Sequence, residues 1–337
     1  MPELTIAAGL ARGLIEFAAA KGANAAGLAR AVGIDPADLA DQDHRLRFDT
    51  YVALMRGAKA ATADPALALH YGETDDLAQI SVVGLLAYAS ETMGDALIQL
   101  NRYGRLVIEF DGPKERFKVV PTADGMWVVD TRENPNAFPE LTESTFARMI
   151  CGPRRVGVAK LAKAVHVTHA APAHAAEYER IFQAPVTFAA EWNAMLIDPI
   201  VASHRVALQP RYVFGILSER AEALSRELER SKSTRGRVES LLLPMLHRGE
   251  SSIAKVAAAM GISRQTLFRR LKAEGVTFEK VLDELRRQMA VNYLTGAKVS
   301  VNETAYLVGF SEPAAFSRAC KRWTGMSPRA LREAMAA

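Results

Sequence analysis

The sequence predicts a multidomain protein, in which an α+β N-terminal domain is followed by an all-α C-terminal domain with two helix-turn-helix motifs. Its 337 residues are too many for one ordinary hydrophobic core. The hydrophobic periodicity changes from helical to mixed and then returns to helical. The charge is also uneven: from Lys232 onward there are 18 Lys and Arg against 9 Asp and Glu, and the remainder has 24 against 29. The basic C-terminal end therefore favours a polyanionic partner.

The composition is typical of a soluble globular protein, with 49% hydrophobic and 24% charged residues. Glu3, Arg12 and Glu16 interrupt the apolar N-terminal run, so we expect neither a signal peptide nor a membrane span. The two cysteines, Cys151 and Cys320, form no CxxC pair. They predict a reducing cytoplasmic location, with no disulfide or metal framework.

The first hundred residues have the pattern of helices. Leu10, Leu14, Phe17 and Ala18 recur at helical spacing. Asp35 is typical of an N-cap followed by proline, and it opens a helical turn over Pro36–Leu39. Further amphipathic helices are predicted over residues 51–61 and 93–103.

Between residues 106 and 202 the pattern becomes mixed. Residues 106–110, 116–120 and 126–130 are β-rich and are separated by turn sequences, which predicts an antiparallel meander. A helix is expected over 140–148, followed by short elements over 165–168, 175–182, 186–188 and 194–197. Residues 1–202 are thus predicted to form one α+β domain.

Residues 203–236 are predicted to connect the two domains. A narrow apolar stripe of Leu217, Ala221, Leu224 and Leu228 marks a helix over 217–230. Two interpretations remain open, a connecting helix that packs on its own domain and a short dimerisation seam. Residues 231–236 are interpreted as a polar linker that ends this helix.

Two later stretches share one pattern of helix, turn and helix. Residues 252–257 are followed by Gly261 and Ser263, and residues 301–305 are followed by Gly309 and Ser311. Glycine supplies the sharp turn because it adopts a positive φ without strain, and each serine is expected to cap the next helix. The second helices keep apolar inner faces: Leu267 and Leu271 in one, Phe316 and Cys320 in the other.

The helix predicted over 278–294 separates the two motifs. Its 17 residues would span about 25 Å, as a rigid spacer between two recognition helices. Successive major-groove faces on one side of a duplex lie about 34 Å apart. Arg binds guanine edges, Gln binds adenine edges, and Lys mostly binds phosphates. The basic outer faces of the second helices thus predict binding to double-stranded DNA.

The C-terminal residues resemble the AraC/XylS family of bacterial transcription regulators over about 237–334. Gly275–Phe278, Arg286, Ala290, and the run from Gly309 through Trp323 to Pro328 carry the resemblance. It implies two recognition helices that present Arg264, Gln265, Phe268, Arg269, Pro313, Ala314, Ser317 and Arg318 to bases. Lys272, Lys321 and Arg322 are expected mostly to meet phosphates, and Ser263, the expected cap of the first recognition helix, is also counted among the DNA-binding residues. The sequence departs from the family pattern at Cys320 and Leu331, where aromatic residues are usual.

The N-terminal half resembles the α+β effector domain of one branch of that family, which includes ornithine-utilisation and virulence regulators. The segments 64–69, 84–88 and 166–178 carry this resemblance, which implies ligand sensing but names no ligand. An acidic domain without a phosphate-binding loop favours an apolar or amphipathic effector, and an amine-like effector is the alternative. Four aromatic residues are candidates for the pocket wall: Tyr88, Tyr103, Trp127 and Phe146.

Other motifs are interpreted as structural. Residues 27–34 imitate a third helix-turn-helix, but the acidic residues after them disfavour DNA. His166, His169 and His174 lack metal-ligand spacing, and Ser144 and Ser203 lack a nucleophile context. We therefore expect no catalytic residue, no metal site and no cofactor.

The sequence thus predicts a cytoplasmic, ligand-responsive activator that binds promoter DNA, contacts RNA polymerase and forms a homodimer. One alternative is a constitutive DNA-binding protein whose N-terminal domain only dimerises. A second is an enzyme fused to a DNA-binding module.

Overall fold

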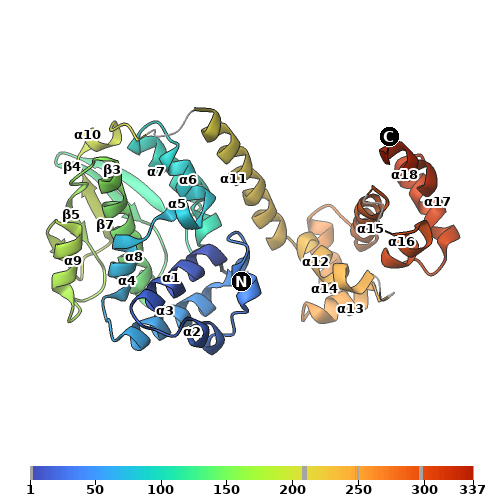
Figure 1. Ribbon diagram of the computed structural model, residues 1–337, viewed down its shortest axis with the longest axis horizontal. Helices are drawn as coiled ribbons and strands as arrows, with labels where there is room; N and C mark the ends of the chain where they lie inside the picture. The colour runs from blue at the N-terminus through green and yellow to red at the C-terminus, as the bar shows by residue number, and fades with distance from the viewer. Residues whose placement is uncertain (1–2, 207–210, 247, 249, 296–298, 337) are drawn as a thin grey trace. The chain divides into compact units, whose positions relative to one another are not determined.

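The computed structural model describes residues 3–206, 211–246, 248, 250–295 and 299–336. The chain divides into two units, Met1–Ser225 and Arg226–Ala337 (Figure 1). The first unit combines helices with two β-sheets, and every element described in the second is a helix. The predicted fold class is therefore confirmed. Residues 207–210 of the predicted linker lie outside the described residues.

Capping residues set the start of several helices in the first unit. Asp35 accepts a hydrogen bond from the Ala37 N–H, and Thr92 forms a capping box with Asp95. The helices before the main sheet are α1 (Ala8–Ala20), α2 (Ala25–Ala31), the 3₁₀ helix η1 (Pro36–Leu39), α3 (Phe48–Thr62), α4 (Leu67–Thr74), α5 (Leu77–Ile80), α6 (Val82–Tyr88) and α7 (Met93–Val107).

Two short strands were not predicted in this region. β1 (Thr5–Ala7) and β2 (Arg45–Arg47) pair antiparallel, with Ile6 opposite Leu46. Three residues are too few to show the alternation by which a strand is predicted. The prediction of an entirely helical first hundred residues is therefore wrong at this pair.

The main sheet has five strands in the order β3-β4-β7-β5-β6. Its strands are β3 (Phe117–Thr122), β4 (Gly125–Asp130), β5 (Ala162–His166), β6 (Val186–Thr187) and β7 (Asn193–Ile197). Among these strands, β5 and β6 pair in parallel and the other neighbours are antiparallel. The β3–β4 hairpin turns between Thr122 and Gly125, as the Asp124–Gly125 turn signal predicts.

The predicted first strand of the meander, residues 106–110, is wrong. α7 continues through Leu106 to Val107, and Ile108 forms only an isolated bridge with Ile6. Leu97, Gly104 and Val107 lie on one side of α7 and share one cavity wall. The helix persists because its apolar face continues to pack, although the sequence from Leu106 to Phe110 is rich in β-formers.

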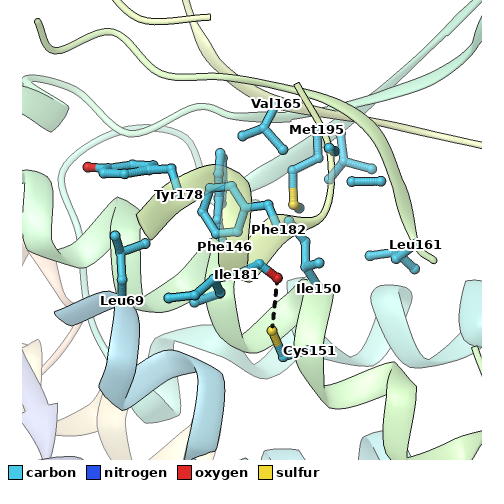
Figure 2. Packing of buried hydrophobic residues seen from close by; sticks show 14 of the residues in the cluster. Leu69, Phe146, Ile150, Cys151, Leu161, Val165, Tyr178, Ile181, Phe182 and Met195 are labelled. Atoms are coloured by element: carbon cyan, nitrogen blue, oxygen red, sulfur yellow. Dashed lines mark hydrogen bonds between the residues drawn. The ribbon is translucent and has the colours of Figure 1, made fainter. Parts of the chain in front are cut away.

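One face of the sheet is covered by two helices, α8 (Pro139–Cys151) and α9 (Ala175–Phe182). Figure 2 shows their contact, where Phe146 of α8 lies beside Phe182 of α9 and the Cys151 thiol approaches the Ile181 carbonyl oxygen at 3.7 Å. Full burial of such an aromatic side chain contributes roughly 1.5–3 kcal/mol. This core fixes α8 against the sheet. The first unit also contains η2 (Pro135–Ala137), η3 (Gly152–Val156) and α10 (Pro199–Ala202).

The linker helix is longer than predicted. α11 covers Arg211–Lys232 and α12 covers Thr234–Leu246, so the predicted polar linker over 231–236 is wrong. Ser233, between the two helices, donates to the Arg230 carbonyl oxygen and accepts from the Gly236 N–H. The polar side chain that suggested a loop therefore caps the next helix.

The second unit holds two small cores joined by one helix. The helices that follow α12 are α13 (Ile253–Ala259), α14 (Arg264–Ala273), α15 (Phe278–Thr295), α16 (Val301–Leu307), α17 (Pro313–Thr324) and α18 (Pro328–Ala336). α15 gives Val281 and Leu285 to the first core, and Ala290 and Leu294 to the second. The helical spacing of these residues lets α15 pack in both cores. α15 therefore connects the two motifs, as predicted for the spacer helix.

Candidate nucleic-acid interface and ligand cavity

The first helix-turn-helix consists of α13 and α14. Ser252 and Ser263 cap the two helices, accepting from the N–H of Lys255 and Thr266 at 3.3 and 3.1 Å. Gly261 adopts a φ of +67° in the turn between them. Leu267 and Leu271 are buried on the inner face of α14. This geometry is the predicted one.

The outer face of α14 is exposed. It carries all six residues predicted for this helix: Ser263, Arg264, Gln265, Phe268, Arg269 and Lys272. Phe268 is 55% exposed, so its ring is accessible for an apolar contact with a thymine methyl group. No ion pair within the described part of the chain engages Arg264, Arg269 or Lys272. These cations and Gln265 are free to meet base edges and phosphates.

The second motif consists of α16 and α17, with Gly309 at a φ of +81° in the turn. Ser311 does not cap α17, so that prediction is wrong. The N-cap residue is Glu312, without a side-chain capping bond, and Pro313 is the first helical residue. Proline fits this position because its φ is already helical and the N–H that it lacks would have no partner there.

The outer face of α17 offers fewer free groups. Ala314, Arg318 and Lys321 are exposed, and Pro313 and Ser317 are half-buried. The Ser317 hydroxyl donates to the Pro313 carbonyl oxygen at 2.9 Å. The guanidinium of Arg322 donates to Asp283 of α15 at 2.6 Å, and Trp323 donates to the same carboxylate. Arg322 therefore helps to anchor α17 to α15.

Arg286 joins the spacer helix to the second turn. Its Nη2 donates to the Gly309 carbonyl oxygen at 2.9 Å, and its guanidinium lies 4.8 Å from the Phe310 ring centroid. Burial lowers the pKa of Arg286, and the nearby Asp283 carboxylate opposes this shift. In the sequence, Arg286 stood out only as one of the residues that carry the family resemblance. In the structure, its contacts with Gly309 and Phe310 position the turn of the second motif.

The first unit contains a cavity of about 530 Å³, within the size range of small-molecule sites. It lies among α6, α7, α8 and strands β3, β4 and β7, and its lining is predominantly apolar. The apolar lining includes Val83, Leu97, Leu100, Met126, Val128, Met149, Met195 and Ile197.

Of the four aromatic residues proposed for a pocket wall, Tyr88 at the end of α6 lines this cavity. Phe146 does not, since it is fully buried on the side of α8 that packs on α9 (Figure 2). The cavity side of α8 instead presents Leu141, Thr145 and Arg148, spaced three to four residues apart.

Tyr103 and Trp127 also lie elsewhere. The Tyr103 hydroxyl donates to Glu222 of α11 at 3.1 Å, so this side chain ties α7 to the linker helix. Trp127 lies on the other face of β4 from Met126 and Val128, with its ring 4.5 Å from that of His166. Successive strand residues point to opposite faces, which separates Trp127 from the cavity.

The sequence did not single out the polar residues of the lining. Arg116 and Arg148 both line the cavity, as does Asn101, whose amide group bonds both backbone groups of Phe117. The sequence held one sign of such residues: the helix predicted over 140–148 contains the charged Glu140, Glu143 and Arg148. In the structure this helix is buried on most sides. Buried charges in such a helix indicate polar partners or a ligand.

The described residues contain no group of three or more His, Cys, Asp and Glu residues able to hold a metal ion. They also contain no helix with the length and apolar character needed to cross a bilayer.

Two family models match the chain. The N-terminal arabinose-binding domain of the AraC transcription regulator matches residues 22–206, more than half of the chain, and a helix-turn-helix domain matches residues 256–334. The match boundaries place the cavity-bearing sheet in the first domain and the exposed faces of α14 and α17 in the second.

Curated relatives match the chain over most of their length. The chain is 27% identical to the ornithine utilization regulator of Pseudomonas aeruginosa, over 96% of this chain and 95% of that protein. It is 25% identical to the HTH-type transcriptional regulator VirS of Mycobacterium tuberculosis, over 90% and 89%. The crystal structure of the transcriptional regulator CdpR from Pseudomonas aeruginosa aligns over 91% of this chain and 96% of that chain, with 22% identity and a TM-score of 0.41. With two family models matched and its helix-turn-helix geometry in place, the chain belongs to the AraC family and is a DNA-binding transcription regulator.

Proposed function

We propose that this regulator is ligand-responsive, and that a small effector in the cavity of the first unit controls promoter binding and activation. The observation that carries the proposal is the apolar cavity of about 530 Å³. Apolar side chains that line empty space lack packing partners, and a ligand that occupies the cavity supplies them. The match to an arabinose-binding domain model supports sensing of some small molecule.

The DNA interface in this proposal uses both motifs. α14 enters one major groove with Arg264, Gln265, Phe268 and Arg269 toward the bases. α17 enters the next groove with Pro313, Ala314, Ser317 and Arg318, while Ser263, Lys272, Lys321 and Arg322 face the backbone. The exposure of α14 and the two turns at Gly261 and Gly309 support this assignment.

The first experiment asks whether a ligand changes DNA affinity. A high-affinity site is selected from random duplex DNA with the purified chain, and a metabolite library is screened by thermal shift. We expect compounds that raise the melting temperature also to change affinity for the selected site, because a ligand shifts a population only by binding one state more tightly. Ligands that bind without any change in DNA affinity or transcription would contradict the proposal.

A matched pair of glycine variants assigns this effect to the cavity. Gly104 of α7 lines the cavity, and a Cβ added there meets no heavy atom within 4 Å. Gly104→Leu is therefore expected to place its side chain in the cavity, starting from an unobstructed Cβ, and to abolish the ligand effect. Gly215 of α11 is equally open but lies outside the lining, so Gly215→Leu should leave the effect intact. Leucine also has the higher helix propensity at both positions.

We propose further that the protein is a homodimer that contacts RNA polymerase from the promoter. Large apolar side chains are exposed on α10 and α11: Ile200 is 73%, Tyr212 78% and Ile216 50% exposed. Exposed groups of this kind support a protein interface. Light scattering should give twice the chain mass, and Tyr212→Ser with Ile216→Ser should lower it. Transcription in vitro from the selected site should rise with the regulator present.

The rival interpretation is a constitutive DNA-binding protein whose first unit only dimerises. Part of the apolar stripe of α11 is not available to a second subunit. Ala221 is fully buried and the adjacent Glu222 binds Tyr103, so this part of the helix packs on its own unit. DNA affinity that no cavity ligand alters, together with a stable dimer, would establish this rival. Turnover of a ligand by the first unit would instead establish the fused-enzyme alternative.

A further inference from the structure

Three arginines lie in the predominantly apolar cavity lining, Arg116, Arg148 and Arg155, and the first two are the more buried. Arg116 precedes β3 and is 7% exposed, and Arg148 lies on α8 with 14% of its side chain exposed. Arg116 donates to the Thr145 hydroxyl at 3.1 Å, and Thr145 is one helical turn before Arg148. The two guanidinium groups therefore belong to one stretch of the wall.

The charge around Arg116 is not balanced. Asp130 accepts from Arg116 at 3.1 Å and from Arg132 at 2.9 Å, and its side chain is fully buried. Within the described residues, no other carboxylate lies within ion-pair distance of either arginine. Burial and the neighbouring Arg116 lower the pKa of Arg132 to about 10, although Asp130 opposes the shift. One positive charge thus remains uncompensated beside the cavity, which is costly without an anion.

Arg148 has unused donors. Its Nε donates to Asp75 at 2.7 Å and its guanidinium stacks near Tyr71, but the buried Nη2 has no hydrogen-bond partner within the described residues. A guanidinium has five N–H donors, and a buried donor without an acceptor is destabilising. A carboxylate beside Arg148 would supply this acceptor once the guanidinium turned its Nη2 toward the cavity.

The acidic residues of the lining are already engaged. Asp75 binds Arg148, Asp76 caps α5 and lies 3.7 Å from Arg155, and Asp95 accepts from Thr92 in the capping box. A cationic head group would have to compete with these partners. The polar part of the cavity therefore favours an anion over an amine.

We propose that the cavity binds an amphipathic carboxylate, with its carboxylate at Arg116 and Arg148 and its apolar body against α7 and the sheet. This inference rests on the proposed function, since it names the effector class of the same cavity. It goes beyond that function because it selects one charge for the ligand. Charge-assisted hydrogen bonds contribute about 1.5–3 kcal/mol, which corresponds to roughly 10- to 150-fold in affinity.

The test compares decanoate, 1-decanol and decylamine on the full chain by calorimetry and thermal shift. The three probes share one flexible ten-carbon chain and differ in the charge of the head group. Decanoate is expected to bind at least about tenfold more tightly than 1-decanol, and decylamine the most weakly. The preference should vanish in Arg148→Met with Asp75→Asn, a double variant that removes both charges of the pair. Arg56→Met, which removes an exposed arginine outside the lining, should retain it.

The outcomes separate this inference from the proposed function. Equal binding of decanoate and 1-decanol, lost in Gly104→Leu, would overturn carboxylate recognition and leave the effector cavity in place. Tightest binding of decylamine would overturn the inference and favour an amine effector. Failure of all three probes to bind would count against both. Decanoate preference that persists in the double variant would also overturn the assigned head-group site.

Discussion

Gly309, in the turn of the second motif, lies against the last turn of α12: a Cβ placed on Gly309 would sit 2.8 Å from the Leu246 carbonyl oxygen. Leu246 belongs to the core of the first motif, whereas Gly309 precedes Phe310 of the second core. The two motifs therefore meet at this point as well as through α15. The proposed contact with two successive grooves depends on the relative placement of the motifs. That placement rests partly on Gly309, a residue without a side chain.

Gly309→Ala is expected to destabilise the second unit and to weaken DNA binding. Alanine at a positive φ costs about 1–2 kcal/mol, and the clash with Leu246 adds to this cost. Gly275→Ala is the matched control, since Gly275 has a φ of +73° but open space around its Cβ position. Urea unfolding should show a larger loss for Gly309→Ala than for Gly275→Ala. Equal losses would show that the contact with Leu246 does not constrain the turn.

Asp130→Asn should destabilise the first unit strongly, by about 3–5 kcal/mol at neutral pH, because it leaves two buried arginines without a carboxylate. Burial by itself raises the pKa of Asp130, but Arg116 and Arg132 outweigh it and hold the pKa below its ordinary value. Its stabilisation is therefore fully present above the unfolded pKa of about 3.9. It is lost as the pH falls through the lower folded pKa.

Urea unfolding between pH 7 and pH 2 checks this expectation. The loss of stability at acid pH should be smaller in Asp130→Asn than in the parent chain, since that carboxylate no longer titrates. Asp49→Asn removes a fully exposed carboxylate and should leave the unfolding midpoint nearly unchanged at neutral pH. An unchanged midpoint for Asp130→Asn as well would refute the proposed ion-pair network.

Cys320 is expected to resist thiol reagents in the folded protein. It is 1% exposed, it packs in the second core beside Phe316, and burial raises the pKa of its thiol. The thiolate is the reactive form, so labelling at pH 8 should be far slower than in denaturant. Mass spectrometry after short pulses, with denatured protein as the control, measures the rate. Rapid labelling of folded Cys320 would indicate a redox-accessible site.

Arg269→Ala is expected to cost about 1–3 kcal/mol on the selected site and to relax preference at one base position. Lys272→Ala, one turn further along the same face of α14, should weaken selected and random DNA alike and reduce the salt slope by about one. Binding titrations at several salt concentrations distinguish the two effects. Equal losses on both DNAs for Arg269→Ala would leave it a phosphate contact.

Local chemistry explains most of the elements predicted from sequence. α9 begins and ends at Ala175 and Phe182 as expected, and Ser252 and Ser263 cap their helices, because each signal involves neighbours along the chain. The errors occur where distant packing overrides local preference. α7 extends through Val107 despite β-rich sequence, and Ser233 caps a helix where a linker was expected.

The sequence by itself determined the two-domain fold class, the two helix-turn-helix motifs and the basic face of α14, because periodicity, capping and charge are properties of contiguous residues. Only the tertiary structure decided which side chains surround the cavity. Tyr88 lines it and Phe146 does not, since each depends on which side of its helix faces the cavity. Arg116, Asp130 and Thr145 come from three separate segments, and no local pattern encodes their meeting. In the unfolded chain, water solvates each of these charges. In the folded chain the arginines are buried beside a single carboxylate, so the charge imbalance exists only once the chain is folded.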